Sequence, residues 1–175
     1  NWQTWEDKYK KRNEIGIPEN SFVILSVGEL NKNKNHEVII RALAEINNPS
    51  IHYIICGKGP LKDYLMTLSK ELHLDQNVHI LGYRKDVIEI LKSSDIFAFP
   101  SIREGLSVSM MEAMAAGLPV VCSEIRGNTD LIKDGEGGYL FKPENVSEVA
   151  KTIKKVIHNS KSLGNVNIQI SKKYF

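Results

Sequence analysis

Short apolar runs recur along the chain and are separated by longer amphipathic segments. Six of these runs are rich in β-branched residues and are bounded by Gly or Pro: residues 22–28, 51–57, 77–82, 94–100, 118–123 and 138–141. A strand that is covered on both faces is a continuous apolar run, whereas a strand with one solvated face alternates. The pattern therefore predicts six strands that are buried on both sides of a sheet.

The segments between these runs carry apolar residues at helical spacing. They predict helices over residues 38–46, 61–72, 87–91, 108–116 and 146–157. Alternating strands and helices form a parallel sheet with helices on both faces, and right-handed crossovers make it a doubly wound, Rossmann-like α/β fold of about six strands. Ligands of such sheets bind beyond the carboxyl ends of the strands. We therefore look for function in the loops that follow the strands.

Composition and charge agree with one globular domain. The chain has 175 residues, of which 42% are hydrophobic and 25% charged, and a formal net charge of +2. This charge is too small to indicate nucleic-acid binding. The basic cluster Lys8–Lys11 is interpreted as a solvated helix face. No apolar stretch approaches the ~20 residues that a membrane span needs.

The two cysteines, Cys56 and Cys122, each lie at the end of an apolar run. This position predicts buried, reduced thiols. The cysteine spacing indicates neither a disulfide framework nor a zinc site. A reducing cytoplasm is the expected compartment. This expectation includes a place at the inner face of the cell membrane.

The segment Pro100–Val121 holds most of the chemical information. It leaves a predicted strand, crosses a loop and enters a helix rich in Ala and Met, which Gly117 is expected to end at the C′ position. This helix should begin near Ser107 and Val108, where free N–H groups and the helix dipole form a site for a phosphate.

Two carboxylates, Glu104 and Glu112, bracket this helix start. Carboxylates accept paired hydrogen bonds, so both would suit the hydroxyls of a sugar beside the phosphate. Spacing alone favours structural explanations instead. Ser109 and Glu112 fit the S-x-x-E capping box, and Glu104 fits a solvated loop acid.

The wider context resembles a known enzyme family. Glu104 and Glu112, with seven residues between them, resemble the E-x7-E motif of the retaining glycosyltransferases of family 4. Five further stretches resemble the family's other blocks in the family's order: residues 26–43, 55–65, 79–101, 112–132 and 134–153. Together they cover about residues 15–158. Members of this family have two Rossmann-like domains that face each other across a cleft, the GT-B fold, and this chain resembles the C-terminal, donor-binding one.

The resemblance implies roles for individual residues. Glu104 would bind hydroxyls of the donor sugar near the reacting carbon, and Lys34 would bind the diphosphate; these are the expected catalytic residues. Glu112 would bind the ribose hydroxyls. The other expected donor-binding residues are Gly28, Gly57, Gly105, Leu106, Ser107 and Val108, with Tyr83 and Arg84 beside the nucleobase.

One charged position departs from the family pattern. Glu29 stands where the family often has an arginine on the diphosphate. Because a carboxylate would repel a diphosphate, we expect Glu29 to turn away or to pair with Lys34. The missing positive charge would then come from Arg84, Arg103 or Arg126.

The histidines are expected to be structural. His36, which with Asn35 replaces the family's glycine after the lysine, is expected to lie on the surface at a helix start. His52 and His79 lie within apolar runs, where a core or rim position is expected.

Competing site motifs are weak or absent. Gly57 and Gly59 resemble part of a dinucleotide fingerprint, but a tight turn with Pro60 at the first helical position also explains them. There is no phosphate-loop motif, no G-x-S-x-G and no D-x-D acid pair. The sequence therefore predicts neither a cofactor nor a metal.

The resemblance implies a division of the chain and a function. Residues 1–14 would be an interdomain linker or the end of a preceding segment, residues 15–160 the nucleotide-sugar-binding domain, and residues 161–175 a helix or tail that returns to an N-terminal acceptor domain. The whole protein would be a retaining hexosyltransferase that moves a sugar from a nucleoside-diphosphate sugar to a saccharide or lipid-linked acceptor in surface polysaccharide synthesis. Peripheral membrane association would occur through the N-terminal domain, and this chain alone would be inactive.

Two alternatives remain open at this stage. One is a non-catalytic, nucleotide-binding Rossmann module, and the other is part of a nucleotide-sugar-modifying enzyme. The sequence also leaves open the donor base (UDP, GDP or ADP), the sugar, the acceptor, the linkage and the oligomeric state.

Overall fold

The structure, a computed structural model, describes residues 5–175 and contains all six predicted strands. The strands are β1 (Phe22–Val27), β2 (Ile51–Cys56), β3 (Val78–Gly82), β4 (Ile96–Phe99), β5 (Val120–Ser123) and β6 (Gly138–Phe141). The helices are α1 (Trp5–Glu14), α2 (His36–Ile46), α3 (Lys62–Glu71), α4 (Val87–Ser93), α5 (Val108–Ala115), α6 (Arg126–Thr129) and α7 (Val146–Tyr174). Residues 1–4 of the predicted linker lie outside the described residues.

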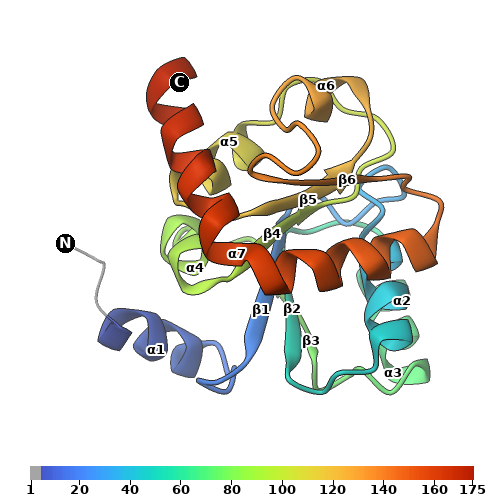
Figure 1. Ribbon diagram of the computed structural model, residues 1–175. Coiled ribbons are helices and arrows are strands. Elements are labelled where there is room, and N and C mark those ends of the chain that lie inside the picture. Colours follow the sequence, from blue (N-terminus) through green and yellow to red (C-terminus); the bar gives the residue numbers. More distant parts are fainter. Residues whose placement is uncertain (1–4) are drawn as a thin grey trace.

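The strands form one parallel sheet in the order β3-β2-β1-β4-β5-β6 (Figure 1). The chain winds outward from β1 to β3, crosses back to β4 beside β1, and then winds the other way. The point of reversal therefore lies between β1 and β4, which is where open α/β sheets bind their ligands. This order confirms the predicted doubly wound, Rossmann-like fold.

The neighbours β1 and β4 are paired over a short length. Their register joins Ile24 to Ile96 and Leu25 to Phe97, whereas the β1–β2 register continues to the last residue of β1. Beyond these pairs the sheet ladder does not join the two strands. The loops that follow β1 and β4 must therefore be held against each other by other contacts.

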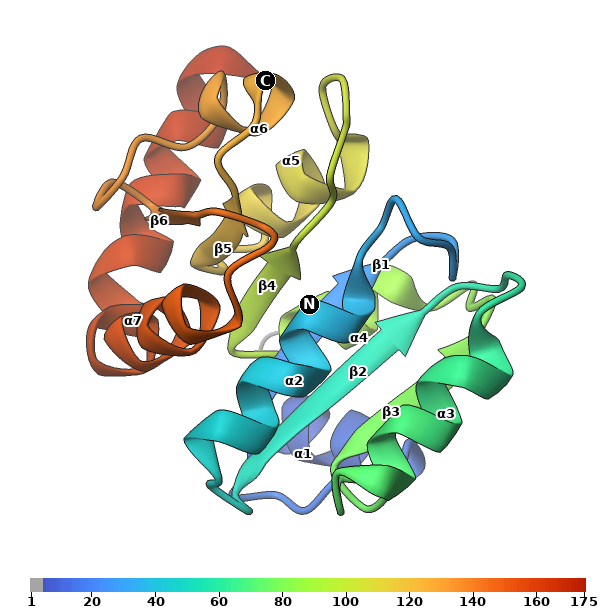
Figure 2. The same ribbon diagram turned by 90° about the vertical axis from the view of Figure 1, so that its right-hand side faces the viewer.

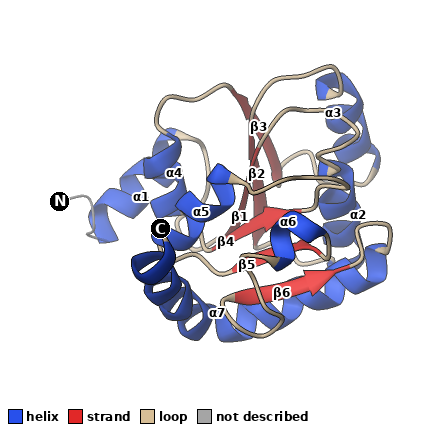
Figure 3. Cartoon of the chain, turned by 90° about the horizontal axis from the view of Figure 1, so that it is seen from above, coloured by secondary structure: helices blue, strands red, loops and turns tan. Residues whose placement is uncertain are grey.

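Helices cover both faces of the sheet, as Figure 3 shows from above. On one face, a hydrophobic cluster joins Ile55 of β2 to Leu43 of α2 and Ile153 of α7. On the other face, a second cluster joins Phe97 of β4 to Met114 of α5. The inner strands β2, β1, β4 and β5 are largely buried on both sides and are mainly apolar, as the sequence pattern predicted. The edge strands β3 and β6 are partly or wholly half-buried, so full burial was wrongly predicted for these two.

Helix α7 contacts the hydrophobic clusters on both faces of the sheet because it bends. Asn159 has non-helical backbone angles, and the chain beyond it turns to pack on α5 (the red helix in Figure 1). Here Asn167, which is fully buried, donates from its side-chain nitrogen to the carbonyl oxygens of Leu118 and Gly137, both at 2.7 Å. The end of the helix is therefore fixed to this domain. The expected return of residues 161–175 to a preceding domain stays a prediction.

Close backbone packing also fixes α7 at the end of α5. Gly117 has φ +83° and follows the C-cap Ala116, which confirms the predicted helix end. A Cβ atom on Gly164 would lie 2.2 Å from the carbonyl oxygen of Gly117. Only a glycine at position 164 permits this approach.

The basic cluster near the N-terminus is not a solvated face. Lys11 is buried and pairs with Glu14, Asp86 and Glu89 at 2.8–3.0 Å, and Lys8 pairs with Asp95 at 3.1 Å. The prediction was wrong because three of the four carboxylates that neutralise these lysines, Asp86, Glu89 and Asp95, lie far away in the sequence, on and beside α4. Glu14, followed by Asp86 and Glu89, raises the pKa of Lys11. The distant carboxylates hold α1 against the domain.

The neighbouring Arg12 is a second buried cation on α1. It is 3% exposed and donates to the carbonyl oxygens of Glu19, Ser21 and Ser93 and to the carboxylate of Asp95, at 2.8–2.9 Å. A buried guanidinium is stable only when its donors are satisfied in this way. Residues 5–14 are therefore packed on the domain rather than loosely attached to it.

The two cysteines are free and buried, as predicted. Burial raises the pKa of the Cys56 thiol to about 12, and also raises the pKa of Cys122. Neither thiol is therefore suited to act as a nucleophile at neutral pH.

The two histidines within apolar runs form a pair at the rim of the core. The Nδ1 of His52 and the Nε2 of His79 are 2.9 Å apart, and the rings are stacked. Burial lowers the pKa of His52, and it lowers the pKa of His79 to about 4, which favours the neutral form of both rings. The expected core or rim position is confirmed.

None of the helices within residues 5–175 is long and apolar enough to cross a membrane.

Asn167 provides a direct test of how the end of α7 is held. The substitution Asn167→Ala should lower the free energy of unfolding by about 3 kcal/mol, because it removes two buried hydrogen bonds and leaves carbonyl oxygens unsatisfied. Asn165→Ala, an exposed asparagine on the same helix, is the matched control and should have little effect. Urea denaturation followed by circular dichroism measures both. Equal stability of the two variants would contradict the packing of α7 described above.

Candidate functional site

The predicted site residues gather along one edge of the sheet. Because the strands are parallel, the segments that follow them leave from the same edge (Figure 2). Gly28 follows β1, Gly57 follows β2, Tyr83 and Arg84 follow β3, and the loop with Glu104 follows β4. These four strands are neighbours in the sheet, in the order β3, β2, β1 and β4. The sequence therefore identified a continuous stretch of the carboxyl edge.

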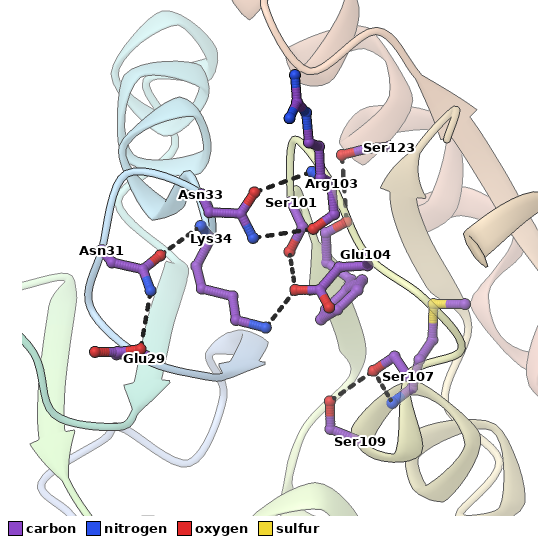
Figure 4. A network of polar contacts seen from close by, with 12 residues as sticks. Glu29, Asn31, Asn33, Lys34, Ser101, Arg103, Glu104, Ser107, Ser109 and Ser123 are labelled. Atoms are coloured by element: carbon purple, nitrogen blue, oxygen red, sulfur yellow. Dashed lines mark hydrogen bonds and ion pairs between the residues drawn. The ribbon is translucent and has the colours of Figure 1, made fainter. Parts of the chain in front are cut away.

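At the β1–β4 junction, Lys34 and Glu104 meet. The ammonium of Lys34 forms an ion pair with Oε1 of Glu104, and the Oγ of Ser101 donates to the same oxygen at 3.2 Å (Figure 4). The Lys34 nitrogen also lies 5.4 Å from the centre of the Phe99 ring. The resemblance placed both charged residues in the site, but Ser101, which is fully buried, was missed. A serine at the end of a strand carries no distinctive signal.

Glu29 turns away from this ion pair. Its Oε2 accepts a hydrogen bond from the side chain of Asn31 at 3.0 Å, and the Oδ1 of Asn31 accepts the backbone N–H of Lys34 at 2.9 Å. Asn31 therefore closes the turn and holds Glu29 on the far side of the loop (Figure 4). The first expectation for Glu29 is confirmed. The alternative of a pair with Lys34 is wrong, because Glu104 occupies that lysine.

Helix α5 begins beside Glu104, as predicted. Ser107 is its N-cap, and its Oγ accepts the N–H of Met110 at 3.2 Å. The N–H groups at the start of the helix have no carbonyl oxygen one turn earlier and point beyond the helix end. Leu106 and Val108 are exposed on either side of Ser107. This end of α5 can therefore donate hydrogen bonds to an anion.

The capping box predicted for Ser109 and Glu112 is wrong. Ser107, two residues earlier, is the cap, so Ser109 lies inside the helix with its Oγ 3.0 Å from the Oγ of Ser107. The error arose because the sequence offers two serines, Ser107 and Ser109, near the start of the helix. Glu112 is exposed and is not needed to cap α5. The structural explanation that competed with a ligand-binding role is thereby removed.

The loop with Glu104 is supported from behind by α6. A Cβ atom on Gly127 would lie 2.1 Å from the carbonyl oxygen of Gly105 and 2.8 Å from that of Glu104. Gly127 therefore allows the backbone of α6 to contact this loop directly. Sequence reasoning did not predict α6, a helix of four residues without an apolar period.

Gly28 and Gly57 lie where two loops contact each other. A Cβ atom on Gly57 would lie 2.0 Å from the carbonyl oxygen of Gly28, and one on Gly59 would lie 2.5 Å from that of Leu30. These glycines are thus required by backbone packing between the loops after β1 and β2. The prediction that Pro60 is the first residue of the next helix is wrong, because α3 begins at Lys62.

Arg84 is held by a carboxylate in the loop after β3. Its guanidinium donates twice to Asp86 at 2.8 Å, and Asp86 also accepts from Lys11 of α1 at 3.0 Å. The two cations lower the pKa of Asp86. Tyr83, in contrast, is 70% exposed, so its ring is available for contact with a ligand.

His36 is buried rather than on the surface. Its Nε2 lies 3.2 Å from the carbonyl oxygen of Glu29 and its Nδ1 lies 3.4 Å from the hydroxyl of Tyr53. The prediction was wrong because Asn35, at φ 56°, turns the chain inward, and its side chain donates to the carbonyl oxygens of Pro100 and Pro143. Burial lowers the pKa of His36 to about 4, so its ring is neutral. The ring contacts the loop that carries Lys34 through the carbonyl oxygen of Glu29.

The remaining candidates for a compensating cation are exposed. Arg103 extends away from the Lys34–Glu104 pair in Figure 4, and Arg126 lies exposed on α6.

Within residues 5–175, no group of three or more His, Cys, Asp or Glu side chains could hold a metal ion. The geometry thus combines one lysine, a helix start and two carboxylates. That set suits a diphosphate flanked by polyhydroxyl groups.

Comparison with known proteins identifies the family. Residues 7–173 match the family model described as glycosyl transferases group 1. The chain is 31% identical to the glycosyltransferase EpsD of Bacillus subtilis over 87% of this chain and 40% of that protein. It is 36% identical, over 79% of this chain and 38% of the relative, to the N-acetylgalactosamine-N,N'-diacetylbacillosaminyl-diphospho-undecaprenol 4-alpha-N-acetylgalactosaminyltransferase of Campylobacter jejuni.

A solved structure agrees with this match. The crystal structure of Anabaena Alr3699/HepE in complex with UDP and glucose has a TM-score of 0.91 at 27% identity, and the similarity covers 97% of this chain and 48% of that one. This chain thus spans less than half the length of the proteins that it matches. It belongs to the group 1 family of glycosyl transferases, and its fold is one Rossmann-like half of the GT-B architecture.

Proposed function

We propose that this chain is the donor-binding domain of a retaining glycosyltransferase. The whole protein would transfer a hexose from a nucleoside-diphosphate sugar to a saccharide or lipid-linked acceptor. The observation that carries the proposal is the Lys34–Glu104 ion pair beside the start of α5, at the reversal point of the sheet. A similar chain, HepE, was crystallised with UDP and glucose, which supports a nucleotide-sugar ligand.

The site divides a nucleotide sugar into three parts. The diphosphate would lie against the ammonium of Lys34 and the N–H groups of Ser107 and Val108, which all favour negative charge. The sugar hydroxyls would be bound by Glu104, and the ribose hydroxyls by Glu112. The nucleobase would lie toward the exposed ring of Tyr83. Arg84, fixed by Asp86, would line the same end of the site.

Catalysis would depend on stabilising the leaving group. When the bond from the sugar to the diphosphate breaks, negative charge develops on the diphosphate oxygens. Lys34 and the start of α5 are already positioned to stabilise this charge, so little reorganisation is needed. Retention would follow from attack on the same face from which the diphosphate departs. The departing phosphate oxygen can take the proton of the acceptor, so no separate base, metal or cofactor is required in the proposal.

The acceptor would be bound by the part of the protein that precedes this domain. The name of the Campylobacter jejuni relative includes an acceptor linked to diphospho-undecaprenol, which supports a lipid-linked saccharide as the class of acceptor. We therefore propose a role in surface polysaccharide synthesis on the cytoplasmic side of the membrane. The two reduced thiols agree with that compartment. Contact with the membrane would come from the preceding domain.

Opposite effects are expected from substitutions of the two partners of the ion pair. Lys34→Ala should weaken UDP binding about tenfold or more, because a charge-assisted hydrogen bond is lost and Glu104 is left without its cation. Glu104→Gln should tighten UDP binding about threefold, because a weaker competitor then holds Lys34. Isothermal titration of this chain with UDP measures both, with Lys154→Ala on the exposed side of α7 as the control. A similar loss of affinity in both variants would contradict competition for Lys34.

Glu112 should contribute to nucleotide binding without contributing to stability. Because Glu112 does not cap α5, Glu112→Ala should leave the thermal midpoint of unfolding unchanged. It should weaken binding of UDP about tenfold, through lost hydrogen bonds to the ribose. Binding of 2′,3′-dideoxy-UDP should be weaker at the outset and insensitive to the substitution. Equal effects on the two nucleotides would show that Glu112 does not bind the ribose hydroxyls.

The isolated chain should bind nucleotide but not transfer sugar. It lacks the acceptor groove that we assign to the preceding domain, so it cannot position an acceptor hydroxyl at the sugar. Incubation with radiolabelled UDP-glucose and a lipid-linked saccharide should give no labelled product. The full-length protein, assayed in parallel with GDP- and ADP-sugars as further donors, serves as the positive control. Labelled product from the isolated chain would refute the proposed division of labour.

A further inference from the structure

The loop that carries Lys34 is bound to the loop that carries Glu104 through Asn33. The side-chain oxygen of Asn33 accepts the N–H of Arg103 at 3.1 Å, and its side-chain nitrogen donates to the carbonyl oxygen of Arg103 at 2.9 Å. In addition, the carbonyl oxygen of Asn33 accepts the N–H of Ile102 at 2.8 Å. Three hydrogen bonds thus join one residue of the first loop to two residues of the second, and Figure 4 shows those between Asn33 and Arg103.

The chemistry of this contact requires an amide. Both bonds from the side chain of Asn33 go to the backbone of the same residue, one to its donor and one to its acceptor. A side-chain amide has a donor and an acceptor side by side, whereas a carboxylate only accepts and a hydroxyl is too short to reach both groups. Since the partners are backbone atoms, the contact does not depend on the side chain of Arg103, which extends away.

The contact of Asn33 with Arg103 joins the two loops at a point where the sheet no longer connects them. The ladder between β1 and β4 includes the Ile24–Ile96 and Leu25–Phe97 pairs, several residues before either loop reaches the site. Asn33 joins the two loops beyond that point. It directly precedes Lys34, and its partner Arg103 directly precedes Glu104. Both charged side chains therefore leave the backbone next to this contact.

The Lys34–Glu104 ion pair cannot replace Asn33 when a ligand binds. If the diphosphate takes the ammonium of Lys34, the ion pair is broken and no longer holds the two loops together. The hydrogen bonds of Asn33 involve neither charged side chain, so they persist in both states.

We propose that Asn33 is a positioning residue that fixes the spacing between the diphosphate-binding lysine and the sugar-binding glutamate. This inference rests on the proposed function for the roles of Lys34 and Glu104. Asn33 itself would not touch the donor. Without it, the loop after β4 would move relative to Lys34, and a ligand that must contact both loops would lose more affinity than one that contacts a single loop.

The test combines amide hydrogen exchange of the chain without ligand and measurements of ligand affinity. In Asn33→Ala, the backbone amide of Arg103 should exchange with solvent at least about tenfold faster. The amide of Ile102, which is bound to the backbone oxygen of Asn33, serves as an internal reference and should change less. Asn33→Asp keeps the acceptor for the N–H of Arg103 and should show intermediate exchange. Asn20→Ala, in the exposed turn before β1, is the matched control.

The second readout compares UDP with UDP-glucose. Asn33→Ala should weaken binding of UDP-glucose about tenfold and binding of UDP about threefold, because only the nucleotide sugar must contact both Lys34 and Glu104. Asn33→Asp, which is isosteric, repeats the comparison if the alanine variant does not fold. An equal loss for the two ligands, or no loss, would overturn the positioning role.

The outcomes separate this inference from the proposed function. If the unchanged chain binds none of UDP, GDP or ADP, the proposed function fails, and the positioning role fails with it, whatever the amide exchange shows. If the unchanged chain binds UDP and UDP-glucose but Asn33→Ala retains both affinities and a protected Arg103 amide, only the inference about Asn33 is wrong.

Discussion

The ion pair between Lys34 and Glu104 joins residues that are 70 positions apart in the sequence. It forms because β1 and β4 are neighbours in a doubly wound sheet, although β2 and β3 lie between them along the chain. The reversal of winding at this point brings two loops together that no helix separates. A cation, a carboxylate and the start of α5 therefore occupy one place. Every functional assignment made for this chain depends on that convergence.

The surrounding structure keeps this place rigid by contacts between backbones. Gly127 lets α6 lie against the loop with Glu104, and Gly57 lets the loop after β2 lie against that after β1. Below the loop, the neutral ring of His36 joins Glu29 to Tyr53. Such fixed supports matter for a site that stabilises developing charge, because donors that are already in place cost little reorganisation.

The sequence predicted the sheet well because burial on both faces leaves a simple signal. The six strands are mainly apolar runs, and their alternation with amphipathic helices was enough to predict a doubly wound, Rossmann-like sheet. The order of the strands was observed only in the structure. The resemblance to a family located Lys34 and Glu104 on the correct edge. It could not show that the two residues pair with each other, because pairing depends on the register of loops rather than on the type of residue.

The wrong predictions for Lys11 and His36 share a physical cause, which is dependence on distant partners, whereas the errors at Ser109 and Pro60 concern only where a helix begins. Lys11 was expected in solvent because its carboxylates at Asp86 and Glu89 are not near it in the sequence. His36 was expected at the surface because the inward turn at Asn35 has no apolar signature. The contacts of Asn33 with the backbone of Arg103 could not be predicted for the same reason. Local patterns define elements, whereas such polar contacts are defined by the assembled fold.

The proposed function depends on the binding of a diphosphate between Lys34 and the start of α5. The most direct test is a titration of the isotope-labelled chain with UDP, followed by two-dimensional NMR of the backbone amides. Binding at this place should give the largest shifts at the amides of Lys34, Ser107 and Val108, with little change at the far end of the sheet near Asn48 and Asn77. Shifts that spare the start of α5 and the Lys34 loop while UDP binds elsewhere would contradict it.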